Sequence, residues 1–234
     1  MSTDPQAPPA RPGPTPVRDR RTLRRVLGAV LMPIGPAAVA VIRSVYPPDA
    51  AAALAAPSTM TLVLWLGLVA TFTLLPGAYT ALHLLHRYVP TLALWTAAFL
   101  VPGYLAMYTL GFVDTVYAIA PAAGLTSTQA EDLVAAADTL VPPTIALLVF
   151  VLGHVVGTVL LGVAARRARL LSTPVAALMI VSQPLHVVSV VLAMPLLDLA
   201  AWGLTALGMG ALALRVLRTP DDEWELPPFP RSAD

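Results

Sequence analysis

Two histidines stand in stretches that are otherwise apolar. His154 lies within VLGHVVGTVLLG and His186 within VSQPLHVVS. On a helix, the polar neighbours of each histidine fall on its own side, because residues three or four apart share one face. Imidazole, amide and hydroxyl groups exchange hydrogen bonds and protons, so this pattern indicates a polar binding or proton-transfer site. The candidate site residues are His154, Thr158, Ser182, Gln183, His186 and Ser189.

The spacing of the two histidines predicts that they meet. Sixteen residues separate His154 from Leu170, the centre of a short basic turn, and sixteen separate Leu170 from His186. In an antiparallel helix pair, equal distances from the turn mean equal depth. We therefore expect both imidazoles near the middle of the membrane, with Pro184 freeing a backbone carbonyl beside them.

Three interpretations of these histidines stay open. Neutral histidines can act as structural glue by bonding to hydroxyl or amide groups, and such bonds between membrane helices average about 0.6 kcal/mol. Ionisable residues inside a membrane also mark binding sites and proton relays. The third interpretation is that the two histidines, on facing helices, are ligands of a b-type haem or a metal ion. Because two ligands alone are a weak metal signal, we expect no bound metal and no cofactor.

The composition indicates that these residues lie in a membrane. Of 234 residues, 57% are hydrophobic and 12% are charged, whereas soluble domains have about 25% charged residues. The length accommodates about six spans of about 20 residues each. The chain contains no cysteine, which excludes disulfides and thiolate metal sites. The pattern predicts an all-α, polytopic membrane helix bundle.

Six apolar runs mark the expected spans. A tail rich in proline and arginine, residues 1–25, precedes them, and an acidic tail, residues 218–234, follows. Both tails have few apolar side chains, so we expect them to be disordered. The transmembrane domain, residues 26–217, includes an outer loop at 114–140. The expected spans are residues 26–42, 59–82, 89–113, 141–165, 174–194 and 196–217.

The arginines orient the expected bundle. Six spans place both termini on one side, and every arginine between Arg11 and Arg218 except Arg43 falls on that side. The positive-inside rule makes it cytoplasmic. Arginine without lysine is typical of GC-rich coding, so we expect the cytoplasmic (inner) membrane of a bacterium. The clustered arginines are expected to contact anionic lipid headgroups, and nothing indicates nucleic-acid binding or a particular protein partner.

Two details concern the outer side. Thr128 and Glu131 have the spacing of a capping box, so a short helix is expected in the outer loop. Arg43 is the one outer cation, and we expect it to pair with Asp114 or Asp198.

The stretches WLGLVATFTLLPGAY, VPGYLAMY, VLGHVVGTVLLG, SQPLHVV and DLAAWGLTALG resemble those of uncharacterised small multi-pass bacterial membrane proteins. The resemblance implies a membrane bundle and transfers no activity. Motifs of hydrolase nucleophiles, metalloproteases and phosphate-binding loops are absent from the sequence, so the prediction leans against an enzyme.

The sequence leads to three functional hypotheses. The first is a small transport or membrane-accessory protein that uses the polar site. The alternative is a passive scaffold or regulatory subunit that binds partners through its tails. The third is a membrane protein that holds haem or metal between His154 and His186.

Overall fold

The described part of the chain is built from helices. The computed structural model describes residues 20–225, and no strand occurs among them. Six helical segments in this range are long and apolar enough to cross a membrane. They are α1 (Arg21–Val45), α3 (Pro57–His86), the run Pro90–Ile119, α7 (Val141–Arg167), α8 (Thr173–Val191) and α9 (Pro195–Arg218). The predicted all-α fold, with six helices long and apolar enough to span a membrane, is therefore confirmed for the described residues.

The third span is longer than predicted and is interrupted by a 3-10 turn. It consists of α4 (Pro90–Ala106), η1 (Met107–Leu110) and α5 (Gly111–Ile119). The sequence analysis ends this span at residue 113, before Asp114. In the structure the Tyr46 hydroxyl donates to Asp114 Oδ1 at 2.8 Å, which satisfies the carboxylate and lets the helix continue. Burial and the neighbouring Asp114 raise the pKa of Tyr46, so its hydroxyl remains a donor.

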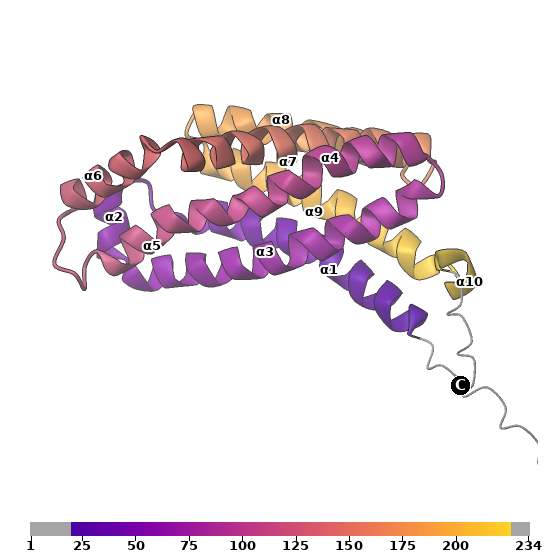
Figure 1. Ribbon diagram of the computed structural model, residues 1–234, viewed down its shortest axis with the longest axis horizontal. Coiled ribbons are helices and arrows are strands. Elements are labelled where there is room, and N and C mark those ends of the chain that lie inside the picture. The colour runs from indigo at the N-terminus through magenta and orange to yellow at the C-terminus, as the bar shows by residue number, and fades with distance from the viewer. Residues whose placement is uncertain (1–19, 226–234) are drawn as a thin grey trace, which may run out of the picture.

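The six spans close into a ring. Each packs against its neighbours in the order α1, α3, α4, α7, α8, α9 and back to α1 (Figure 1). The most extensive contacts join α1 to α9, α1 to α3, and α4 to α7. The first and last described residues meet at one end, as an even number of spans requires (Figure 1). The short helices α2 (Ala50–Ala55) and α6 (Ser127–Asp138) lie at the other end.

The start of α6 differs from the prediction. The Thr126 hydroxyl accepts from the Gln129 N–H at 3.3 Å, and Gln129 Oε1 accepts from the Thr126 N–H at 2.9 Å. The capping box predicted at Thr128 and Glu131 is therefore wrong by two residues. Both pairs have the required spacing, and the chain uses the earlier one, which begins the helix sooner.

Both predicted tails contain ordered segments. Residues 1–19 and 226–234 lie outside the described residues. Residues 21–25, in contrast, form the first turns of α1, and α10 (Asp221–Trp224) lies within the predicted acidic tail. Within the described range, the expectation of disorder is thus wrong for these two segments. Basic side chains of residues 21–25 form ion pairs with acidic side chains of residues 221–225, and these contacts hold both segments in place.

Three ion pairs and one buried aromatic side chain hold α10 against the bundle. The pairs are Arg21–Asp222 at 2.7 Å, Arg24–Glu225 at 2.8 Å and Arg25–Asp221 at 2.8 Å. Trp224 is buried, and its carbonyl accepts from His83 Nε2 at 2.8 Å. We call this arrangement of residues 221–225 on α1 and α3 the C-terminal latch.

When pH alone is changed, the latch should open only in acid. Hydrogen bonds from the Thr22 hydroxyl and the Arg25 guanidinium hold the pKa of Asp221 below its ordinary value of 3.8. A carboxyl with a lowered pKa stabilises the docked state while it is ionised, and this stabilisation is lost as pH falls through the lowered pKa. We therefore expect a spin label on Glu223→Cys to keep the same mobility from about pH 8 to about pH 5 and to become mobile only below pH 3.8. Release near neutral pH would contradict this.

Glycines set the distance between α4 and α7. A Cβ on Gly153 would lie 2.5 Å from Gly103 Cα and 2.7 Å from the Phe99 carbonyl oxygen. A Cβ on Gly157 would lie 2.7 Å from Leu100 Cα. These separations are shorter than any real side chain tolerates, so only glycine allows the two backbones to approach this closely. Gly153 and Gly157 therefore pack two helices of one chain against each other.

Candidate functional site

Three charged or ionisable side chains join α1, α9 and α8. The Arg43 guanidinium donates to Asp198 Oδ2, and His186 Nδ1 lies 2.5 Å from Asp198 Oδ1. The Asp198 side chain is 1% exposed and that of His186 12%, whereas the Arg43 side chain is 35% exposed. Of the two partners predicted for Arg43, Asp198 is therefore correct, and Asp114 is bound by Tyr46 instead.

Asp198 is a buried carboxylate, and burial of an ionised group costs hydration free energy. It lies in the first turn of α9, where the unpaired N–H groups of the helix favour negative charge. Each of its oxygens also has a partner on another helix. These contacts offset the hydration that a buried carboxylate loses.

The Nδ1 atom of His186 has two neighbours but only one bonding position. Asp198 Oδ1 lies at 2.5 Å, and Trp202 Nε1–H points at the same nitrogen from 3.2 Å. Nδ1 carries either a proton or a lone pair, so it cannot donate to the carboxylate and accept from the indole at once. The shorter contact with the carboxylate is the stronger one. His186 Nε2 makes no hydrogen bond to the described residues and is the atom open to a further proton or ligand.

His154 stands directly beside His186. Its ring centroid lies 5.5 Å from that of His186, 4.2 Å from that of Phe150 and 5.8 Å from that of Trp202. The structure thus brings the two histidines together, as their equal spacing from the turn predicts. The Phe150 carbonyl can only accept, so its 2.5 Å contact with His154 Nδ1 places the proton on Nδ1. His154 Nε2 is buried, without a hydrogen-bond partner among the described residues.

Two further predicted residues bond to a threonine that the sequence analysis did not select. Gln183 Nε2 donates to Thr205 Oγ1 at 2.7 Å, and Ser182 Oγ lies 2.8 Å from the same oxygen. Gln183 Oε1 is buried and has no partner in the described part of the chain. Ser189 does not join them, because its hydroxyl donates at 2.6 Å to the His186 carbonyl of its own helix.

Thr158 lies one turn from His154 and faces Tyr104 of α4. The two hydroxyls are buried close to each other, without a well-aligned hydrogen bond in the described structure. Buried polar atoms are normally bonded to protein or water. With the free atoms of His154 and Gln183, these hydroxyls offer donors and acceptors to a polar ligand. We call the whole set the polar column: Arg43, Tyr104, His154, Thr158, Ser182, Gln183, His186, Asp198, Trp202 and Thr205.

The polar column does not extend to both ends of the ring. Its exposed members, Arg43 and His186, lie toward the end that carries α2 and α6. The next layer on the other side is apolar and fully buried, and includes Leu161, Met179 and Met209. The side chain of Met179 fills the space opposite Gly208.

The contribution of α9 to the polar column was not predicted. The sequence indicated Asp198 only as a partner for Arg43, and it did not indicate Trp202 or Thr205 as site residues. A signal was nevertheless present, because these three residues recur at i, i+4 and i+7 and so share one face of a helix.

Sequence and structure comparisons do not supply a function for this site. Comparisons with protein-family models, curated proteins and solved structures find no match to this chain. Among the described residues, no three histidine, aspartate or glutamate side chains form a group that could hold a metal ion. The function must therefore be inferred from the polar column.

Proposed function

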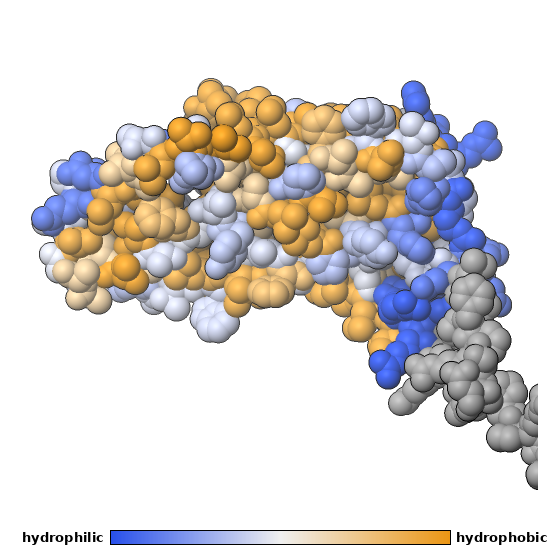
Figure 2. Space-filling model, viewed as in Figure 1, coloured by the Kyte–Doolittle hydropathy of each residue, from blue (hydrophilic) through white to orange (hydrophobic). Residues whose placement is uncertain are grey.

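We propose that this chain is a multi-pass protein of a bacterial cytoplasmic membrane with both termini in the cytoplasm. Apart from Arg43, the described arginines lie at the end of the bundle that holds the first and last described residues. This end is strongly hydrophilic in Figure 2. We call this the arginine end. Positively charged residues remain on the cytoplasmic side of such membranes, and they attract anionic lipid headgroups. Acidic side chains such as Asp49, Glu131 and Asp132 lie at the opposite end.

The polar column, in this proposal, binds and releases protons in a small transport or membrane-accessory protein. The observation that carries the proposal is the set of contacts Arg43–Asp198–His186, whose central carboxylate is buried. Arg43 and Asp198 neutralise each other. A proton on His186 therefore changes the net charge of these three side chains from zero to plus one. Structural glue needs only neutral hydrogen bonds, whereas buried charges cost desolvation and usually serve a function.

The proton path begins at the outer end of the column. His186 Nε2 receives the proton, because Nδ1 is engaged by Asp198. His154 Nε2 is the next free acceptor, with the rings 5.5 Å apart. Release toward the arginine end requires movement of the apolar layer around Met179. Pro184 gives α8 a point at which it can bend, since proline removes a backbone hydrogen bond.

The fluorescence of Trp202 tests proton binding directly. Its indole touches His186 and stacks near His154, while Asp198 and Arg43 are the charged groups that face His186. A protonated imidazole quenches a neighbouring indole, so proton binding at His186 should lower the emission as the buffer is made more acidic. We expect His186→Gln and Trp202→Phe each to remove this response. A wild-type response equal to that of His186→Gln would overturn the proposal and favour a passive scaffold.

A metal ion or haem is a second candidate occupant, favoured by the orientation of the histidines. Both Nδ1 atoms are held by oxygen acceptors, which leaves both Nε2 atoms free. Histidines that bind metals are oriented in this way by their neighbours. Visible absorption and metal content of protein purified without chelators test this candidate. A haem band or stoichiometric metal that is lost in His154→Gln would support it, and a colourless, metal-free protein would exclude it.

A further inference from the structure

We propose that the C-terminal latch covers a binding surface for anionic phospholipid headgroups and that such lipids displace it. The surface is formed by Arg21, Arg24 and Arg25, which lie three and four residues apart and so share one side of α1. Each is paired with one acidic side chain of residues 221–225. The acidic segment thus occupies the positions that phosphate oxygens would take.

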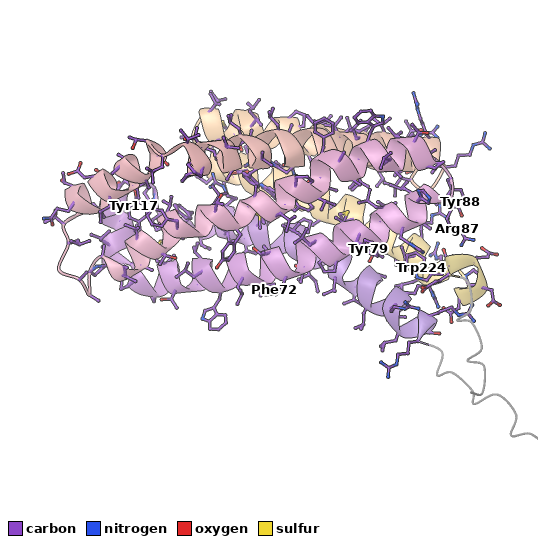
Figure 3. The ribbon with its side chains drawn as sticks, in the orientation of Figure 1. Phe72, Tyr79, Arg87, Tyr88, Tyr117 and Trp224 are labelled. Carbon is purple, nitrogen blue, oxygen red and sulfur yellow. The ribbon has the colours of Figure 1, made fainter. Side chains whose placement is uncertain are left out.

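The latch lies at the level of the lipid headgroups. Only two residues, Thr219 and Pro220, separate the end of α9 from the start of α10. The Trp224 ring packs at 4.5 Å between centroids on His83, near the end of α3. Tyr79, which is 70% exposed, lies one turn away with its ring centroid 6.4 Å from that of His83. Figure 3 shows Tyr79, Trp224 and Arg87 at the same end of the ring, where aromatic and basic residues mark the membrane interface.

Three arginines of α1 face three acidic side chains of the latch, one in each ion pair. Anionic lipid headgroups can therefore compete with these acidic side chains for the arginines. Each ion pair keeps at least one side chain that is partly open to solvent: Asp222 is 87% exposed, Arg24 60% and Asp221 28%. Ion pairs that solvent can reach are weak, and basic residues are attracted to an anionic membrane surface. Lipid phosphates can therefore replace the acidic side chains as partners of the arginines.

Release of the latch has a second consequence. Trp224 leaves its buried position against His83 and becomes free to enter the interface, where tryptophan is favoured. The acidic segment then extends from the membrane surface with Asp221, Asp222 and Glu225 unpaired. Lipid composition would thus decide whether the chain presents this segment to the cytoplasm.

Spin-label distances in lipid nanodiscs test the inference on the full chain. The sequence has no cysteine, so labels at Glu223→Cys and Tyr88→Cys attach nowhere else. In phosphatidylcholine alone we expect one narrow distance distribution. With phosphatidylglycerol added, most molecules should move to a broad, longer distribution. Inorganic phosphate in phosphatidylcholine discs, matched for ionic strength, should leave the narrow distribution unchanged.

Two variants keep the result interpretable. Asp221→Asn/Asp222→Asn/Glu225→Gln should give the broad distribution in both lipids, whereas Asp132→Asn, an acidic change on α6, should behave like the wild type. A narrow distribution that is identical in both lipids, or a broad one in phosphatidylcholine, would overturn the proposal. Opening by inorganic phosphate would also overturn it, because the surface would then not select lipid. Both leaflets of a nanodisc have the same lipid, so the outcome is independent of the proposed orientation and proton binding.

Discussion

Replacing Gly153 with valine is expected to separate α4 from α7 and to lower the free energy of unfolding by about 3 kcal/mol. The new side chain would begin 2.5 Å from Gly103 Cα, and backbone atoms cannot move aside as a flexible side chain can. The effect should reach the polar column, because the next residue is His154. The thermal unfolding midpoint in detergent, together with the pH response of Trp202 fluorescence, measures both consequences.

Gly203→Val is the matched control for this substitution. It also replaces a glycine within a spanning helix, but a Cβ at Gly203 meets nothing within 4 Å. We expect this variant to unfold at the wild-type temperature or slightly above it, since glycine is a poor helix former. Equal unfolding temperatures for Gly153→Val and Gly203→Val would show that α4 and α7 do not pack through their glycines.

Replacing Arg43 with alanine is expected to destabilise the protein by about 3 kcal/mol at pH 8, because it leaves a buried charge without its partner. Asp198 is 1% exposed and would retain only His186. Chemical unfolding of the variant and the wild type at pH 8 measures the loss.

Two companion variants separate the charge effect from loss of packing. Arg43→Ala/Asp198→Asn should recover most of the stability at pH 8, because it removes the unpaired charge while keeping the shape of the side chain. Arg87→Ala, at the exposed end of α3, should have almost no effect. A loss in Arg43→Ala that Asp198→Asn fails to relieve would mean that Arg43 acts through packing.

The sequence alone determined the properties that depend on local composition. The number of spans follows from the length and apolarity of each run, because a helix must cross the hydrocarbon with its own side chains. The meeting of His154 and His186 follows from their equal distance to one short turn. The connection between the fifth and sixth spans is also short. A short connection forces neighbouring helices to run antiparallel, so the relative direction of these two spans follows from the sequence.

Tertiary structure decided every contact that depends on closure of the ring. Asp198 joins Arg43 across 155 positions, and Asp221 joins Arg25 across 196, only because α9 returns to pack on α1. The predicted topology narrowed the partners of Arg43 to Asp114 and Asp198, but it did not decide between them or place His186 beside Asp198. The acidic segment was expected to be disordered. That expectation failed because the energy of a buried or interfacial charge is set by partners that the fold brings to it.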